Sequence, residues 1–289
     1  MSGRPQDKIG VVGGGTMGAG IAEVCARAGL DVVVVEADAV SASAASERIR
    51  SSLERAVKQG KVDAEDAEAA LARTSCVVEF DALADRTLVV EAVLEEHDAK
   101  VGVFERLAQV VDDSSAILAS NTSSIPIVEL AAAARYRGPH VLGLHFFNPV
   151  PVLSLVEIIP SLLTEPSVTE RAQAFVSETL GKDPIIAPDR AGFTVNTLLI
   201  PYLLSAIRMF EQGLASAEDI DEGMVKGCAH PMGPLALADL IGLDTVKGVA
   251  DSLYREHKEQ LFAPPPLLQR LVAADLLGRK TKRGLYEYT

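Results

Sequence analysis

The sequence predicts an α/β fold with a doubly wound, mostly parallel sheet, followed by an all-α C-terminal domain. Short apolar segments typical of strands alternate with helical segments through the first part of the chain. From about residue 189 the sequence is typical of helices separated by Pro and Gly. The change falls at Pro188-Asp189-Arg190-Ala191-Gly192. We therefore expect domains at residues 1–188 and 189–289, with a ligand cleft between them.

The composition is that of a globular protein with a substantial core: of 289 residues, 48% are hydrophobic and 23% are charged. The apolar runs are too short to span a bilayer, and we expect no signal peptide. The net charge of −13 argues against a nucleic-acid partner and requires a local basic patch if the substrate is an anion. Cys25, Cys76 and Cys228 lack metal-ligand spacing, so we expect reduced thiols, no metal and a cytoplasmic protein.

A glycine-rich turn follows the first strand. Gly13-x-Gly15-x-x-Gly18 leads into a helix expected at residues 17–28, and then into a strand at residues 32–35. Gly13 permits a tight turn, Gly15 lets the backbone approach a pyrophosphate, and Gly18 lets the helix pack closely on the strand. The first N–H groups of the helix then face the anion. This order predicts a Rossmann-type dinucleotide-binding domain. FAD proteins share the pattern, and a glycine turn without a ligand is the alternative.

Glu36, at the end of the second strand, indicates which dinucleotide binds. A carboxylate there can accept hydrogen bonds from both ribose hydroxyls of the adenosine. It would repel a 2′-phosphate, so we expect NAD as the cofactor rather than NADP.

The remaining elements are predicted from apolar periodicity and from Pro and Gly. Residues 40–59 and 64–72 are expected to form a helical hairpin inserted into the Rossmann pattern. Strands are expected at residues 76–78, 88–91, 116–120, 141–145, 155–159 and 183–186, and further helices at 99–110 and 168–180. The C-terminal domain is expected to contain helices at 195–212, 217–227, 235–257 and 265–277, and a short strand-like tail at 284–288.

Polar stretches interrupt three apolar strands near their C-terminal ends, where ligands bind in open α/β sheets. They are residues 119–124, 143–149 and 156–159. His145 is the natural acid–base group, because histidine exchanges a proton near neutral pH; the alternative is a structural histidine at a strand end. Glu157 lies in an apolar run, where a carboxylate needs a partner such as that imidazole. The alternative for Glu157 is an exposed strand edge.

Three further features have both a functional and a structural interpretation. Residues 120–124 can cap the helix that follows them and can also donate to a substrate oxygen. Asn196 can bond a substrate carbonyl, or it can be only a polar residue at a helix start. The basic side chains of residues 48–61 can hold the phosphates of an acyl carrier, or can form a solvated helix face with neighbouring glutamates.

Motifs along nearly the whole chain point to one family. They are Gly13-x-Gly15-x-x-Gly18, Val90-Glu91-Ala92-Val93-Leu94-Glu95, Ser120-Asn121-Thr122-Ser123-Ser124, Gly143-Leu144-His145-Phe146-Phe147-Asn148-Pro149-Val150-Pro151, Gly192-Phe193-Thr194-Val195-Asn196 and His230-Pro231-Met232-Gly233-Pro234. Together they resemble the short-chain L-3-hydroxyacyl-CoA dehydrogenases, and most closely the bacterial 3-hydroxybutyryl-CoA dehydrogenases. The His-Phe-Phe-Asn-Pro segment is very specific.

The resemblance implies a role for each polar residue of the candidate site. His145 and Glu157 would form a catalytic dyad. Ser123 would contact the 3-oxygen of the substrate, and Asn196 would help to hold the reacting group. The helical C-terminal domain would form the interface of a homodimer.

The resemblance also implies binding residues for the cofactor and the carrier. Glu95 and Lys100 would contact the nicotinamide-side ribose of NAD, and Glu36 the adenosine ribose. The complete predicted cofactor set is Gly13, Gly15, Thr16, Met17, Gly18, Glu36, Glu95, Lys100 and Asn121. Ser52 and Lys58 are the positions that would take CoA.

Three positions depart from the commonest family pattern. Glu36 replaces the more usual Asp, which should preserve the NAD preference. Thr197 stands where several relatives carry Arg, and Gln59 stands where some carry a second Lys. The last two positions bear on acyl and carrier specificity and leave the reaction type unchanged.

We therefore expect reversible hydride transfer between NAD and an L-3-hydroxyacyl thioester with a short acyl chain such as hydroxybutyryl. Such a reaction can serve fatty-acid degradation, butanoate metabolism or polyester synthesis. Relatives that act on carrier-protein-bound hydroxyacyl groups, or on free hydroxy or diketo acids, give the alternative. Lambda-crystallin, a structural protein of the lens, also resembles the family. Retention of His145, Glu157, Ser123 and Asn196 argues against a purely structural role.

Overall fold

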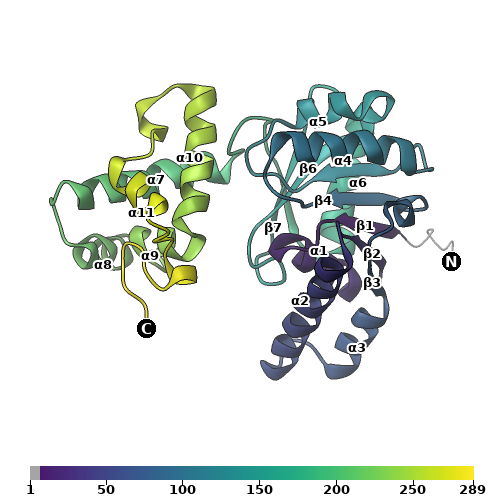
Figure 1. The fold of residues 1–289 in the computed structure, drawn as a ribbon, viewed down its shortest axis with the longest axis horizontal. Helices are drawn as coiled ribbons and strands as arrows, with labels where there is room; N and C mark the ends of the chain where they lie inside the picture. Colours follow the sequence, from purple (N-terminus) through teal and green to yellow (C-terminus); the bar gives the residue numbers. More distant parts are fainter. Residues whose placement is uncertain (1–6) are drawn as a thin grey trace. The chain divides into compact units, whose positions relative to one another are not determined.

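The computed structural model describes residues 7–289, which form two compact units (Figure 1). The first unit ends at Asp189 and the second runs from Arg190 to Thr289. Each has its own hydrophobic core.

The first unit is built on an eight-stranded sheet with the order β3-β2-β1-β4-β5-β6-β7-β8. The strands are β1 (Lys8–Val12), β2 (Asp31–Val35), β3 (Thr74–Val77), β4 (Leu88–Glu91), β5 (Ile117–Ser120), β6 (Val141–Phe146), β7 (Leu155–Pro160) and β8 (Asp183–Ile186). All neighbouring strands are parallel except β6 and β7, which are antiparallel. The predicted doubly wound, mostly parallel sheet is confirmed. The strand order reverses at β1, between β2 and β4, where ligands bind in such sheets.

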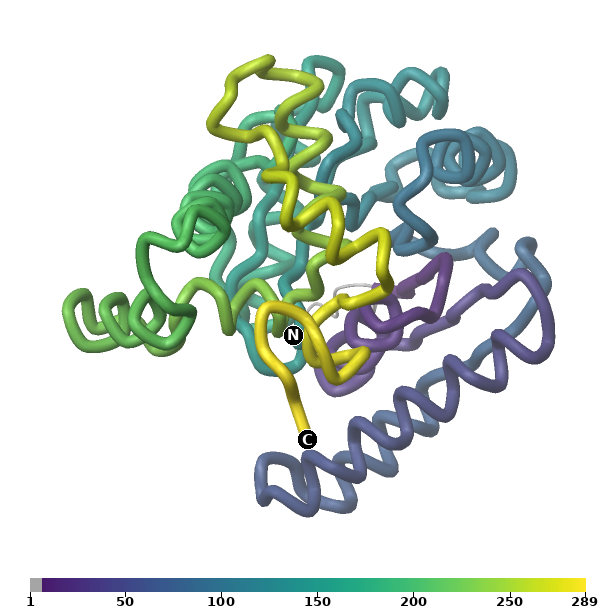
Figure 2. The backbone as a smooth tube through the Cα atoms, turned by 60° about the vertical axis from the view of Figure 1, so that its left-hand side comes forward, coloured from purple at the N-terminus to yellow at the C-terminus, as the bar shows by residue number. Residues whose placement is uncertain are grey.

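Helices cover this sheet and extend beyond it. They are α1 (Thr16–Arg27), α2 (Ala39–Lys58), α3 (Ala64–Ala72), α4 (His97–Val110), α5 (Ile127–Ala133) and α6 (Pro166–Ala174), the last continued by a π-helical turn at Phe175–Thr179. Figure 2 shows α2 and α3 as a long hairpin that projects from the sheet, which confirms the predicted insertion. Asp38 begins α2 by accepting a hydrogen bond from the Ser41 backbone N–H.

The core of the first unit lies between α1 and the sheet, where apolar side chains of both are buried. Ile21 of α1 is fully buried, as are Val11, Val32 and Val34 of the first two strands. Burial of side chains of this size stabilises the fold by about 1.5–3 kcal/mol each. The packing fixes the glycine turn between β1 and α1, and with it one end of the candidate site.

The second unit is helical. Its helices are α7 (Val195–Glu211), α8 (Ala217–Cys228), α9 (Pro234–Ile241), α10 (Leu243–His257) and α11 (Pro266–Ala273), with short 3-10 turns at Gln260–Phe262 and Arg279–Thr281. Buried apolar side chains of α7, α9, α10 and α11 form its core, among them Leu203, Ile207, Leu235, Val246 and Leu268. The all-α prediction for this part of the chain is confirmed.

Three predictions about the second unit are wrong in detail. The helix predicted at residues 235–257 is broken at Gly242, whose φ of +102° lies in a region open mainly to glycine. The helix predicted at 265–277 ends at Ala273. The tail at 284–288 forms no named strand, only isolated bridges from Arg283 to Gly278 and Glu287.

Neither a membrane-spanning helix nor a metal-binding cluster is found in the described residues 7–289. No helix there combines the length and the apolar character that a membrane crossing needs. No cluster of three or more His, Cys, Asp or Glu side chains there could hold a metal ion.

Candidate functional site

The glycine turn between β1 and α1 has the geometry that the three glycines predict. Gly13 has a φ of +91°. A Cβ on Gly18 would lie 1.8 Å from the Gly13 carbonyl oxygen, whereas a Cβ on Gly15 would meet nothing within 4 Å. No side chain caps the N-terminus of α1, which begins at Thr16 and Met17. Gly15 thus leaves open space beside an uncapped helix start, as a bound pyrophosphate requires.

Gly14, inside the motif, is a site residue that the sequence reasoning missed. Its N–H donates to Glu36 Oε1 at 2.7 Å, and its carbonyl accepts from Arg48 Nη1 at 3.2 Å. A Cβ on Gly14 would lie 2.4 Å from that of Ala45, so only glycine fits. The run of three consecutive glycines was the available signal. The contact fixes the Glu36 carboxylate at the C-terminal end of β2.

His145 and Glu157 meet across the antiparallel pair β6 and β7, where they are register partners. His145 Nδ1 lies 2.7 Å from Glu157 Oε2. On the other side of the ring, His145 Nε2 lies 3.2 Å from Ser123 Oγ. Glu157 is fully buried and His145 is 5% exposed. Glu157 therefore fixes one ring nitrogen, and the other faces the Ser123 hydroxyl.

Hydrogen bonds to β6 and within the loop fix the segment that carries Ser123. Asn121 Oδ1 accepts a hydrogen bond of 2.8 Å from the Phe146 backbone N–H, which ties the loop to β6. Thr122 Oγ1 accepts from the N–H groups of Ser124 and Ile125 at 3.3 and 3.0 Å. These contacts set the position of Ser123.

The prediction that residues 120–124 cap the following helix is wrong. Helix α5 begins at Ile127, and its first two N–H groups donate to the Asp189 carboxylate at 2.7 and 2.8 Å. Asp189 lies far away in the sequence, so the local pattern of Ser and Thr could not show it. The hydroxyls of the loop are used instead within the loop and by Glu95.

The Glu95 carboxylate accepts hydrogen bonds from several donors of this loop. Its Oε1 accepts from Thr122 Oγ1 at 2.6 Å, from the Ser123 N–H at 2.9 Å, and from the N–H and Oγ of Ser124 at 3.1 and 2.9 Å. Desolvation acts to raise the pKa of Glu95. The charge of Lys100 and these hydrogen bonds outweigh it and hold the pKa below its ordinary value. The carboxylate is therefore ionised at neutral pH, although its side chain is only 41% exposed.

Lys100 is buried beneath Glu95, with 1% of its side chain exposed. Its Nζ lies 2.6 Å from Glu91 Oε1 and 3.3 Å from Glu95 Oε2. The sequence reasoning placed Lys100 against the ribose and did not single out Glu91. A glutamate at a strand end has no local feature that marks it as buried, so only the fold shows this pair.

The predicted carrier residues lie on α2, where Ser52 is half-buried and Lys58 is exposed. Arg48 does not belong to a basic patch with Lys58, because its guanidinium is turned to the Gly14 carbonyl. Arg55 Nε donates to the Ser51 carbonyl at 3.2 Å, within the same helix. The basic segment is therefore divided between the glycine turn and the outer part of the hairpin.

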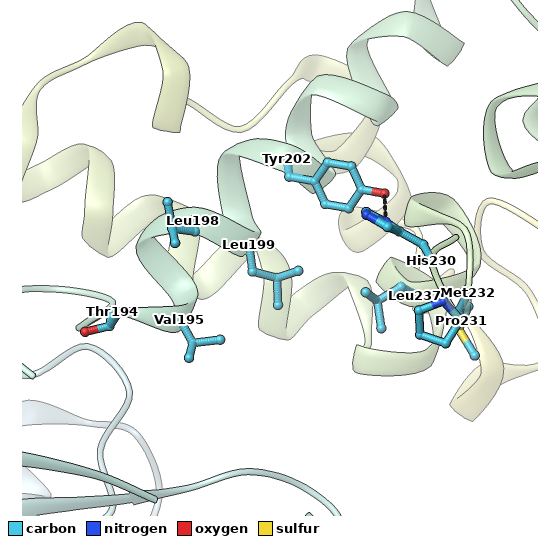
Figure 3. Close-up of a pocket in the computed structure, with 9 residues that line it drawn as sticks. All are labelled: Thr194, Val195, Leu198, Leu199, Tyr202, His230, Pro231, Met232 and Leu237. Carbon is cyan, nitrogen blue, oxygen red and sulfur yellow. Dashed lines mark hydrogen bonds between the residues drawn. The ribbon is translucent and has the colours of Figure 1, made fainter. Parts of the chain in front are cut away.

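Asn196 belongs to the second unit, where it is the second residue of α7 and is half-buried. Its neighbours line an apolar pocket of about 610 Å³ within that unit (Figure 3). The lining residues are Thr194, Val195, Leu198, Leu199, Tyr202, His230, Pro231, Met232 and Leu237. The polar groups at one end of the pocket include Tyr202 OH and His230 Nδ1, 3.0 Å apart.

Two family models together match nearly the whole chain. The 3-hydroxyacyl-CoA dehydrogenase NAD binding domain matches residues 8–190, and the 3-hydroxyacyl-CoA dehydrogenase C-terminal domain matches residues 192–288. The first unit is therefore an NAD-binding domain, which confirms the predicted cofactor.

Relatives match along nearly the whole of this chain and most of their own length. The chain is 52% identical to a 3-hydroxybutyryl-CoA dehydrogenase of Mycobacterium tuberculosis, over 97% of this chain and 98% of the relative. It is 40% identical to the mitochondrial hydroxyacyl-coenzyme A dehydrogenase of Sus scrofa, over 97% and 90%.

Solved structures agree as well. The crystal structure of M. tuberculosis FadB2 has a TM-score of 0.97 at 51% identity, covering 99% of this chain and all of that one. The (S)-3-hydroxybutyryl-CoA dehydrogenase PaaH1 of Ralstonia eutropha has a TM-score of 0.92 at 43% identity, with coverage of 99% and 100%. The resemblance predicted from the sequence motifs is confirmed: the chain belongs to the 3-hydroxyacyl-CoA dehydrogenase family.

Proposed function

We propose that this protein transfers hydride reversibly between NAD and C3 of a short-chain L-3-hydroxyacyl-CoA, such as 3-hydroxybutyryl-CoA. The observation that carries the proposal is the placement of His145 between Glu157 and Ser123, at 2.7 and 3.2 Å. An imidazole held by a buried carboxylate, with its second nitrogen beside a hydroxyl, is the arrangement that a proton-transfer step needs. The family membership gives the same reaction class.

In oxidation, His145 Nε2 takes the proton of the substrate hydroxyl, and in reduction it returns that proton. Glu157 accepts the hydrogen bond from Nδ1 and stabilises the imidazolium that forms. Ser123 lies next to the same nitrogen and is placed to bond the 3-oxygen. Bound NAD supplies the hydride acceptor for the carbon. We also assign Asn196 to hold the reacting group of the substrate.

The residues of the glycine turn fit the cofactor. Gly13, Gly15 and Gly18 provide the turn, the open approach and the close packing that a pyrophosphate site needs, with Thr16 and Met17 at the helix start. The Glu36 carboxylate, held by Gly14, is placed at the end of β2 for the adenosine ribose.

On the nicotinamide side, the ionised Glu95 is placed to accept from the ribose, and Lys100 acts by holding Glu95. Asn121 aligns the neighbouring loop with β6. We assign CoA to Ser52 and Lys58 on α2, since the inserted hairpin carries basic side chains in a chain of strongly negative net charge. We also propose a homodimer formed through the second unit, and a cytoplasmic location.

The test is NADH oxidation with acetoacetyl-CoA, with NADPH as the competing cofactor and His145→Ala as the control. Rapid turnover with NADH that is lost in the variant supports the cofactor, the reaction and the base together. An NADH-binding protein that does not turn over acetoacetyl-CoA contradicts the CoA substrate and favours a carrier-protein thioester or a free hydroxy acid. Lys58→Glu separates these cases, because it should weaken a CoA enzyme and spare a free-acid enzyme.

A further inference from the structure

The carboxylate of Glu91 is buried at the C-terminal end of β4, and its contacts account for both of its oxygens. Glu91 is 0% exposed. Its Oε1 accepts from Lys100 Nζ at 2.6 Å and from the Val93 N–H at 2.7 Å. Its Oε2 accepts from Ser120 Oγ at 2.6 Å. A buried carboxylate is costly unless its charge and lone pairs are satisfied in this way.

We propose that Glu91 is a positioning residue for the catalytic hydroxyl and imidazole, acting through Lys100 and Glu95. Lys100 Nζ lies between the two carboxylates, at 2.6 Å from Glu91 and 3.3 Å from Glu95. Glu91 is the closer and the more deeply buried of the two partners. Its negative charge is therefore what retains a cation in a place with 1% exposure.

The next contacts carry the effect to the reacting groups. Held by Lys100, Glu95 orients the N–H groups of Ser123 and Ser124, which both donate to its Oε1. Ser123 Oγ then lies 3.2 Å from His145 Nε2. From Glu91 to His145 the path consists only of ion pairs and hydrogen bonds, and all of it lies within the first unit.

A second contact of Glu91 also positions the loop that carries Ser123. Ser120 Oγ donates to Glu91 Oε2 and also accepts from the Thr122 N–H at 3.2 Å. Glu91 thus holds the end of β5 directly, at the point where the loop to Ser123 begins. Both contacts place the same loop, so loss of Glu91 should displace Ser123. Glu91 itself is fully buried and has no assigned contact with substrate or cofactor.

The first experiment, which rests on the proposed function, compares Glu91→Gln with Glu23→Gln. Glu23 is a matched control, because it is also a buried carboxylate, 1% exposed, and its cation Arg27 lies on the same helix α1. In NADH oxidation with acetoacetyl-CoA, E91Q should lower kcat by about 10-fold to 100-fold, since a displacement of about 1 Å at a reacting group costs that much. KM should change less than kcat, and E23Q should stay within about twofold of the wild type. A loss as large in E23Q overturns the proposal.

A double-mutant cycle separates positioning from a general loss of folded enzyme. If Glu91 acts in part through Glu95, then E91Q should cost less activity in an E95Q background than in the wild type, and the loss that remains is that of the Ser120 contact. Equal losses with and without Glu95 overturn the proposal, because a stability defect is the same in either background. Glu91→Asp keeps the charge and shortens the reach. Glu91→Asp replaces E91Q in these experiments if E91Q does not fold. It should show the same coupling to Glu95 with a smaller loss of activity.

Hydrogen exchange gives a readout that needs no substrate. The Ser123 and Ser124 amides should exchange faster in E91Q or E91D than in the wild type and in E23Q. Unchanged exchange at these two amides overturns the proposal. Failure of the wild type to oxidise NADH with acetoacetyl-CoA would contradict the proposed function instead, and the exchange measurement would still decide the role of Glu91.

Discussion

His145 and Glu157 lie directly opposite each other on the antiparallel strands β6 and β7, with Nδ1 and Oε2 2.7 Å apart. The other pairs of neighbouring strands in the sheet are parallel. Register partners on neighbouring strands project from the same face of the sheet, so their side chains can come into contact. The register of β6 and β7 therefore brings a buried carboxylate to the imidazole.

Glu157→Gln should lower kcat by about 100-fold or more, the range seen when a general acid–base group is impaired. The amide keeps the shape of the side chain but carries no charge to stabilise the imidazolium. If its NH₂ group donates to Nδ1, the ring adopts the wrong tautomer. Steady-state kinetics with NADH and acetoacetyl-CoA measure the change. A kcat within about threefold of the wild type would exclude the proposed dyad.

Ser123→Ala should lower kcat by about 10-fold, because a hydrogen bond to the reacting oxygen is lost while the fold is retained. The Ser123 N–H still donates to Glu95 in the variant, so the loop keeps its anchor. Ser124→Ala is the matched control: it removes a hydroxyl from the same loop, but one that donates to Glu95 rather than facing His145. Equal losses in the two variants would show that the hydroxyl acts only by shaping the loop.

The residues predicted from the sequence are those whose environment can be read locally. His145 and Glu157 stood out because each interrupts an apolar strand, and the glycines stood out because their spacing has one common use. Glu91 and Asp189 could not be found in this way. Their partners Lys100 and Ile127 come from other elements, and no local pattern distinguishes them from ordinary strand-end or loop acids.

The fold shows the same division between local and long-range causes. Strands and helices follow apolar periodicity, so most of their bounds were predicted to within a few residues. Gly242 inside an apolar helical pattern gave too weak a signal to predict the break between α9 and α10. The tail is held by Asp239, whose carboxylate accepts from the N–H groups of Leu285 and Tyr286, both at 2.9 Å. Those contacts replace the strand that the sequence suggested.

Gly15→Ala and Gly18→Ala should separate ligand binding from folding. A Cβ on Gly15 meets no protein atom within 4 Å, and its φ of −61° suits alanine, so thermal stability should be unchanged or slightly higher. The same Cβ occupies the approach of the pyrophosphate, so the Kd for NADH should rise by about 10-fold or more. A Cβ on Gly18 would lie 1.8 Å from the Gly13 carbonyl oxygen, so Gly18→Ala should lower the Tm.

Fluorescence titration with NADH and thermal unfolding measure the two effects. Unaltered NADH affinity in folded Gly15→Ala would place the cofactor elsewhere.

Glu36→Gln should weaken the preference for NADH over NADPH by about 10-fold or more. The amide can still accept the Gly14 N–H, so the turn is kept, while the charge that repels a 2′-phosphate is lost. The ratio of kcat/KM for the two cofactors measures the preference. Glu47→Gln removes the same charge from an exposed position on α2 and should leave the ratio unchanged. A shift of the ratio in both variants would assign the preference to net charge.

Tyr288 should make the stability of the second unit fall at high pH. Burial, and then the hydrogen bond and charge of Asp239, raise the pKa of Tyr288 to about 12. An unfolded tyrosine has a pKa of about 10. Since the folded value is the higher one, the contribution of this phenol to the unfolding free energy is complete below about pH 10 and is lost as the pH rises toward 12.

Tyr288→Phe tests this expectation. At neutral pH the variant should be less stable by about 1 kcal/mol, because the bond of 2.9 Å from the phenol to Asp239 is lost. The difference from the wild type should shrink between pH 10 and pH 12, because only the wild type loses the ionisation-linked stability in that interval. Urea unfolding followed by circular dichroism measures it, with the exposed Tyr254→Phe as the control. A difference that stays constant or widens with pH would show that the Tyr288 phenol is not held by Asp239.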